Sequence, residues 1–231
     1  MSVELEIVED PARVCAAMMV GAAAAGGHIV LTGGSTPQSA YEEFVRAVQA
    51  LEADVSGSHF WFGDERCVGP EDERSNFRMA QQALFAPLGE GPVVHRMHGE
   101  AGPAAGAQAY EAELREAGEP EFDLLLLGMG PDGHVASLFP GQDTLGVRDQ
   151  LVVGVPHAGL EPFVPRISFT LTTIGRAARV AFLISGEGKA KAVERAFGSA
   201  AEPNDAVPAS LVPTVAEHVT VLLDPAAAAR L

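Results

Sequence analysis

Four consecutive leucines, at positions 124–127, run directly into a glycine-rich turn that carries Asp132 and His134. A continuous apolar run bounded by Asp123 and glycines is typical of a parallel strand that helices cover on both faces. In open α/β sheets, ligands bind beyond the carboxyl ends of such strands. Histidine changes its protonation state near neutral pH, so the sequence predicts a proton-transfer site at the end of this strand.

Strand and helix patterns alternate along the whole chain of 231 residues, of which 47% are apolar. The alternation predicts an α/β fold in which helices cover both faces of a mostly parallel sheet, a modified Rossmann-like, doubly wound arrangement. We expect one domain, residues 1–231. Strands are expected at 3–8, 28–34, 59–65, 93–97, 124–127, 151–158, 167–174, 179–185 and 218–224. Helices are expected at about 10–25, 38–52, 76–85, 104–117 and 189–197, and in a short Ala-rich tail.

The net charge of −16 argues against a nucleic-acid partner, because a phosphate backbone is held by basic surface. No run of eighteen apolar residues and no basic segment before an apolar one occur, so neither a membrane span nor a leader is expected. Cys15 and Cys67 form no disulfide or zinc pattern, and His95 and His98 lack a third metal ligand. We expect a cytoplasmic protein without a metal.

A glycine-rich turn, Gly33-Gly34-Ser35-Thr36-Pro37, connects a predicted strand to a predicted helix. Free backbone N–H groups and the helix dipole make such a turn suitable for an anion. A capped helix after a tight turn explains the same pattern equally well. No Gly-Lys-Ser/Thr follows, so this is not a Walker loop.

Two cations follow other loops, and each has a functional and an ordinary interpretation. Arg166 begins a predicted strand after a proline-rich loop, and Lys189 begins a predicted helix after 185–188. The positive end of a helix disfavours a lysine, so an anionic ligand would explain its place there. Both side chains could equally be ordinary surface cations.

Gly128, Gly130 and Gly133 satisfy the G-x-G-x-x-G spacing of dinucleotide-binding folds. That fingerprint requires an acidic residue about twenty positions later, at the end of the next strand. The predicted strand 151–158 ends without one, which makes a dinucleotide site the weaker interpretation.

Asp64, Glu65 and Arg66 follow the apolar stretch 60–62. Charges at the end of this strand emerge at the same sheet edge as Asp132 and His134, so we favour a functional role for Asp64 and Arg66. For the other acidic residues of the segment we expect a solvated loop: Glu65, Glu71, Asp72 and Glu73.

Taken together, five segments resemble the 6-phosphogluconolactonase family in order and spacing: 31–37, 61–68 with 75–80, 124–141, 165–172 and 185–193. The resemblance covers nearly the whole chain and implies hydrolysis of 6-phospho-D-glucono-1,5-lactone to 6-phospho-D-gluconate, in the oxidative pentose phosphate pathway. It implies no metal and no organic cofactor. We expect a small-molecule sugar phosphate lactone as the partner, no membrane, and a monomer or weak homo-oligomer.

Opening a lactone with water needs a base, a positive group for the carbonyl oxygen and an acid for the departing alkoxide. We assign His134 as base and then acid, Asp132 as the group that orients it, and Arg66 to the developing oxyanion. We expect the substrate phosphate on Gly33, Gly34, Ser35 and Thr36, together with Arg166 and Lys189.

The same superfamily contains the glucosamine-6-phosphate deaminases, which share the glycine-rich loop and the Asp-Gly-His turn. Deaminases resemble this chain but carry a glutamate five residues after the histidine, where Phe139 stands here. They also tend to have Asp-Glu-Tyr at 64–66. In a deaminase Asp64 would move a proton between C1 and C2 of the sugar. A non-catalytic sugar-phosphate sensor on the same scaffold is the third alternative.

Overall fold

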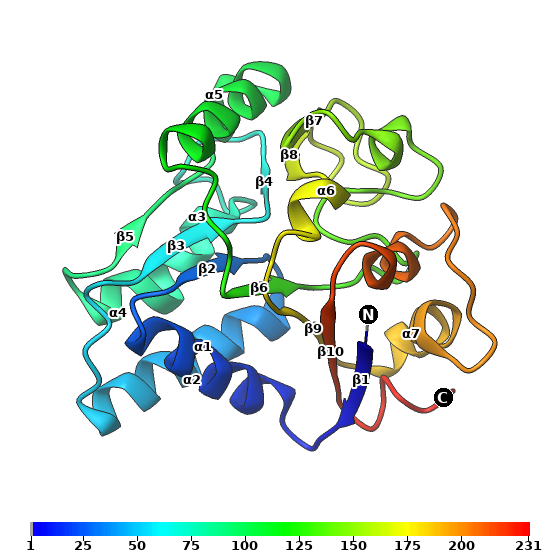
Figure 1. The fold of residues 1–231 in the computed structure, drawn as a ribbon, viewed down its shortest axis with the longest axis horizontal. Coiled ribbons are helices and arrows are strands. Elements are labelled where there is room, and N and C mark those ends of the chain that lie inside the picture. Colours follow the sequence, from blue (N-terminus) through cyan, green and yellow to red (C-terminus); the bar gives the residue numbers. More distant parts are fainter. Residues whose placement is uncertain (1) are drawn as a thin grey trace.

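A seven-stranded parallel sheet is the centre of the computed structural model, which describes residues 2–231. The strands lie in the order β1-β10-β9-β6-β2-β3-β5 (Figure 1). All four leucines of β6 are buried, and the strand pairs with β2 and β9 as the apolar run predicts. The strands are β1 (Ser2–Ile7), β2 (His28–Leu31), β3 (His59–Phe62), β5 (Val93–Val94), β6 (Leu124–Leu127), β9 (Val180–Ile184) and β10 (His218–Leu223).

Helices cover both faces of this sheet. Successive side chains of a strand point to opposite faces, and on β3 Phe60 contacts Phe44 of α2 whereas Trp61 contacts Tyr110 of α5. In Figure 1, α1 and α2 accordingly lie on one side of the sheet and α5 on the other. The α/β prediction with a mostly parallel sheet is confirmed. The main helices are α1 (Pro11–Ala24), α2 (Ser35–Leu51), α5 (Pro103–Glu116) and α7 (Ala190–Phe197).

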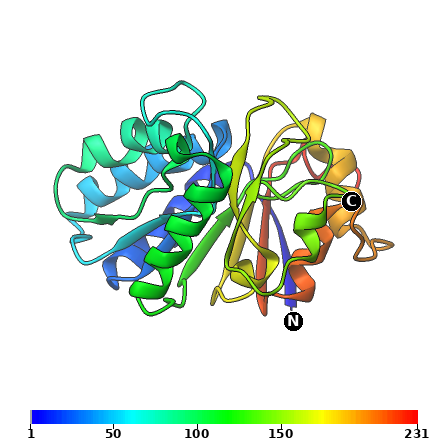
Figure 2. The ribbon, with the colours of Figure 1, turned by 90° about the horizontal axis from the view of Figure 1, so that it is seen from above.

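The expected strand 59–65 is divided between two sheets. Gly63 donates its N–H to Leu31 O of β2 at 2.9 Å and accepts at its carbonyl from Phe169 N at 2.8 Å, so the chain leaves the large sheet at this residue. The next strand, β4 (Asp64–Arg66), belongs to a separate antiparallel sheet of order β4-β8-β7. Its other strands are β7 (Val152–Val155) and β8 (Arg166–Phe169). Viewed from above, this small sheet stands beside the large one (Figure 2).

The expected strand 167–174 stops early. The Thr170 hydroxyl accepts from Thr173 N and caps α6 (Leu171–Ile174), because threonine offers the backbone a helical alternative to the sheet ladder. The expected Ala-rich helical tail is also wrong, since 225–230 form turns.

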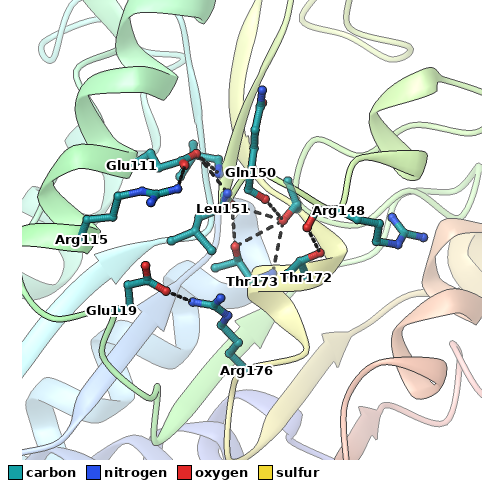
Figure 3. Close-up of polar contacts among 11 residues, drawn as sticks. Glu111, Arg115, Glu119, Arg148, Gln150, Leu151, Thr172, Thr173 and Arg176 are labelled. Atoms are coloured by element: carbon teal, nitrogen blue, oxygen red, sulfur yellow. Dashed lines mark hydrogen bonds and ion pairs between the residues drawn. The ribbon is translucent and has the colours of Figure 1, made fainter.

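The edge of the small sheet is fastened to the neighbouring helices, as Figure 3 shows. The Glu111 carboxylate on α5 accepts from Leu151 N at 3.0 Å and Val152 N at 3.2 Å. On the other side, Thr173 Oγ1 donates to Leu151 O at 2.6 Å. These bonds anchor the start of β7, the edge strand of the small sheet that carries Arg166.

The remaining elements are short. The predicted helix 76–85 is confirmed as α3 (Asn76–Ala80), a π-helical turn (Gln81–Phe85) and α4 (Ala86–Leu88). Four 3₁₀ turns complete the chain, at Gly99–Ala101, Asp143–Gly146, Glu187–Lys189 and Pro208–Thr214. Within residues 2–231, no helix is both long enough and apolar enough to cross a membrane.

Candidate active site

A cavity of about 280 Å³ lies at the carboxyl ends of β2, β6 and β9, beside the small sheet. This is the edge at which open α/β sheets bind ligands. The cavity is lined by nine of the ten side chains and turn residues predicted from the sequence: Gly33, Gly34, Ser35, Thr36, Asp64, Arg66, His134, Arg166 and Lys189. The tenth, Asp132, contacts His134.

His134 and Asp132 form a hydrogen-bonded pair, with His134 Nδ1 2.6 Å from Asp132 Oδ1. A carboxylate at Nδ1 holds the proton on that nitrogen, which leaves Nε2 as the atom that can accept a proton. Burial opposes ionisation of Asp132, yet the hydrogen bond and the charge of His134 hold its pKa below the usual value. The turn is so tight that a Cβ at Gly130 would collide with both side chains.

Phe139 packs against the His134 ring with 4.7 Å between ring centroids. It is fully buried apart from its contribution to the cavity wall. The position five residues after the histidine therefore offers an apolar surface and no group that exchanges protons.

Arg66 and Arg166 lie directly opposite each other on β4 and β8. Like charges on opposed strands repel. Burial lowers the pKa of Arg166, and the charge of Arg66 lowers it further, whereas the charge of Asp64 raises it. Arg166 donates to Val164 O at 3.1 Å and Pro162 O at 2.8 Å. Among residues 2–231, the buried Arg66 Nε has no hydrogen-bond partner. Both arginines line the cavity, and an anionic ligand there would offset the repulsion between their guanidinium groups.

The glycine-rich turn leads straight into α2, whose first residue is Ser35. Gly34 precedes it with φ of 118° and no side chain caps the helix. The interpretation as a helix capped by a side chain therefore does not apply. The first residues of α2 line the cavity, so the free N–H groups of its first turn and the positive end of the helix dipole lie beside it.

Lys189 reaches the cavity from the turn before α7. Its Nζ donates to Met129 O at 2.7 Å, immediately before the turn that carries the histidine. Burial lowers the pKa of Lys189, and the charge of Asp132 opposes that shift. The Lys189 ammonium thus lies between the turn after β6 and the cavity, and its other N–H donors are available to an anion.

Asp64 is buried, with 5% of its surface exposed. Its Oδ2 accepts from Ser137 Oγ at 2.7 Å, and its Oδ1 accepts from Asn76 Nδ2 at 3.2 Å. Sequence reasoning missed Ser137 and Asn76, because their contacts with Asp64 span 73 and 12 residues and leave no local signal.

Glu65 does not belong to a solvated loop, so that expectation is wrong. Only 2% of its surface is exposed, and its carboxylate accepts from Arg66 N, Asn76 N, Phe77 N and Ser75 Oγ. The missed signal is the helix start at Ser75, since the free N–H groups of a first turn attract a carboxylate. Within residues 2–231, no three His, Cys, Asp or Glu side chains gather as metal ligands would.

Comparison with known proteins agrees with this geometry. The family model described as glucosamine-6-phosphate isomerases/6-phosphogluconolactonase matches residues 5–221. A 6-phosphogluconolactonase of Synechocystis sp. is 37% identical over 228 residues, covering 94% of this chain and 91% of that protein. The solved 6-phosphogluconolactonase from Trypanosoma cruzi superposes with a TM-score of 0.86 at 27% identity, over 100% of this chain and 97% of that one.

The fold is also shared with a monomeric glucosamine-6-phosphate deaminase, at a TM-score of 0.83, 20% identity and full coverage of both chains. The fold alone therefore does not separate the two activities. The family model spans the glycine-rich turn, the 64–66 segment and the His134 turn, and the chain belongs to the glucosamine-6-phosphate isomerase/6-phosphogluconolactonase family.

Proposed function

We propose that this chain is a lactonase that hydrolyses 6-phospho-D-glucono-1,5-lactone to 6-phospho-D-gluconate in the oxidative pentose phosphate pathway. The observation that carries the proposal is one cavity lined by Arg66 and by His134, the histidine that is hydrogen-bonded to Asp132. Relatives that cover most of the chain bear the name of this enzyme.

The residues supply each step of the hydrolysis. His134 Nε2 takes a proton from water as the water oxygen attacks the lactone carbonyl, and Asp132 stabilises the imidazolium that forms. Arg66 donates to the carbonyl oxygen, where negative charge grows. As the bond to the ring oxygen breaks, His134 returns the proton to the departing alkoxide. Water and side chains complete the reaction, so we propose no metal and no organic cofactor.

The substrate phosphate is proposed to rest on the first turn of α2, residues Gly33 to Thr36, with Arg166 and Lys189. Backbone N–H groups, a helix dipole and two cations favour a dianion there. They also offset locally the repulsion expected from a net charge of −16.

Two observations favour the lactonase over the alternatives. Phe139, which packs against His134, cannot exchange a proton, so this position lacks the glutamate of the amino-sugar deaminases. A sugar-phosphate sensor would need the anion site but not a His134–Asp132 pair aimed at it.

The deciding experiment follows acid release from freshly generated phosphogluconolactone against its spontaneous hydrolysis. We expect acceleration by the purified protein, weaker acceleration with unphosphorylated gluconolactone, and no ammonia from glucosamine 6-phosphate above background. Robust ammonia release would replace the lactonase by a deaminase. Product binding without acceleration would favour the sensor.

We further propose that residues 1–231 act as a single domain, as a monomer or weak homo-oligomer in the cytoplasm. The strong negative charge supports the weak association, because like-charged copies repel each other.

A further inference from the structure

We propose that Glu65 is a positioning residue of the lactonase reaction, which fixes the backbone from which Arg66 and Asn76 enter the cavity. The inference deepens the proposed function and rests on it. Arg66 and Asn76 line the cavity, whereas Glu65, on β4 with its carboxylate against the start of α3, is not among its lining residues. Any effect of Glu65 on turnover must therefore pass through its neighbours.

One carboxylate fastens both ends of the loop 66–76. Glu65 Oε1 accepts from Arg66 N and from Asn76 N, each at 2.7 Å. Its Oε2 accepts from Phe77 N at 2.7 Å and from Ser75 Oγ at 3.0 Å. Burial raises the pKa of Glu65, and the four hydrogen bonds oppose this rise. All four partners are donors, so the ionised carboxylate is the form that fits their geometry. The backbone N–H groups of Arg66 and Asn76, the two residues that line the cavity, are thus both bonded to Glu65 Oε1.

The middle of this loop has little else to hold it. Gly69, Glu71, Glu73 and Arg74 are exposed, and the ion pair between Arg74 and Asp72 is a surface pair, which contributes little. The bond from Arg66 Nη1 to Arg74 O, at 2.5 Å, ties the arginine to this exposed segment rather than to the core. The start of the loop is paired with β8, and Cys67 N donates to Pro165 O at 2.8 Å. Glu65 adds a buried side-chain attachment, which joins the Arg66 backbone to the start of α3.

The attachment continues to the catalytic pair. Asn76 Nδ2 donates to Asp64 O at 2.9 Å and to Asp64 Oδ1, and Asp64 Oδ2 accepts from Ser137 Oγ. Ser137 lies three residues after His134, in the turn that follows. Asn76 thus connects the carboxylate of Glu65 to that of Asp64. Through Ser137, these contacts fix the position of the loop 66–76 relative to the segment that carries His134.

The test compares Glu65→Gln with the matched control Glu73→Gln, an exposed glutamate of the same loop. Glutamine keeps one acceptor oxygen and places an NH₂ group against a backbone donor. A displacement of about 1 Å near reacting groups costs up to roughly 100-fold. We expect Glu65→Gln to lower kcat by about 10- to 100-fold with little change in KM, and Glu73→Gln to match the wild type.

A double-mutant cycle with Arg66→Met separates positioning from general stability. If Glu65 acts through Arg66, Glu65→Gln costs much less in the Arg66→Met background than in the wild type. An equal cost in both backgrounds, or an unchanged kcat in the single variant, would overturn the inference. Should Glu65→Gln not fold, Glu65→Asp, which keeps the charge but is one methylene shorter, enters the same cycle. A wild type that does not accelerate lactone hydrolysis would instead refute the proposed function, before any variant is compared.

Discussion

The two ends of the parallel sheet each hold a histidine hydrogen-bonded to a carboxylate. At the carboxyl end His134 lies 2.6 Å from Asp132. Near the amino ends of β2 and β3, His95 Nδ1 lies 2.7 Å from Glu113 Oε1. The two pairs have nearly the same geometry, yet only the first lines the cavity at the carboxyl edge.

The difference lies in what surrounds the rings. We call His28, His59 and His95 the histidine cluster. Its rings stack at 4.5 Å between His28 and His59 and 5.3 Å between His59 and His95, and Trp61 stacks on His95 at 3.6 Å. His59 Nδ1 faces His95 Nε2 at 3.0 Å, and Trp61 Nε1 donates to His28 Nδ1 at 3.0 Å. In the cluster, the ring nitrogens in hydrogen-bond contact face another imidazole, the indole or Glu113. His134, by contrast, lines a cavity that is also lined by cations. A histidine–carboxylate pair is therefore a candidate catalytic site only where its free ring nitrogen is accessible from a cavity and cationic side chains lie nearby.

The largest expected effect is the loss of turnover in His134→Ala. A general acid–base group contributes about 10²- to 10⁴-fold, so kcat for the phosphorylated lactone should fall by this factor while the melting temperature stays close to that of the wild type. His95→Ala, assayed at a temperature where it is folded, should keep the wild-type kcat. Near-normal turnover in His134→Ala, or an equal loss in His95→Ala, would contradict the distinction between the two ends.

The next effect is that of Arg66→Met. Removing one donor to an oxyanion lowers kcat by about 10²-fold or more, and KM should change far less. Arg74→Met serves as the control, because Arg74 is an exposed arginine of the same loop. Steady-state kinetics with both variants measure the effect. An unchanged kcat in Arg66→Met would remove the role of this arginine and leave the lactonase assignment in place.

A smaller effect is expected for Lys189→Ala. A charged hydrogen bond is worth roughly 1.5–3 kcal/mol, so the variant should bind phosphogluconate more weakly by this amount and bind gluconate almost unchanged. Titration calorimetry with both ligands measures the difference. Lys191→Ala, a change at an exposed lysine of α7, provides the control. Equal losses for both ligands would show that Lys189 acts on stability instead of on the phosphate.

The smallest effect concerns the pH dependence of stability at the amino end. Burial lowers the pKa of His28 and of His59; the neighbouring imidazoles add to this, and Asp123 opposes it at His28. Because the folded values lie below the value of an unfolded histidine, the unfolded chain binds more protons in acid. The stabilisation is therefore complete above about pH 6.5 and is lost as the pH falls through the lowered values. Within the cluster, the carboxylate of Glu113 contacts His95.

Urea unfolding between pH 8 and pH 5 measures this dependence, and Trp61, the single tryptophan of the chain, reports on the cluster directly. The double change His28→Phe with His59→Phe should keep the stacking and flatten the dependence over this range. His157→Gln, at an exposed histidine, should not change it. A wild type whose stability is flat from pH 8 to 5 would refute the prediction.

Much of the fold and most of the candidate site follow from local pattern. The leucine run of β6 predicts a buried parallel strand, because only a strand covered on both faces can be apolar at every position. Once the strands are parallel, their carboxyl ends meet at one edge, and this brings the Gly33–Gly34 turn, Asp64 and His134 together without further information. The predicted site residues lie within a few positions of a strand or helix end, where periodicity is most informative.

Other features depended on partners that are distant in the sequence. Gly63 divides the expected strand 59–65 between two sheets because β8, a hundred positions later, competes for its carbonyl. Glu65 is buried because the first turn of α3 returns to it, and Asp64 accepts from Ser137 across 73 residues. The histidine cluster likewise joins β2, β3 and the segment after β5. The sequence by itself determined the type and order of the main elements and the edge where the chemistry lies, since these follow from the apolar periodicity of each segment. Only the tertiary structure decided whether a given charge is solvated, paired or buried, since that depends on which distant donor reaches it.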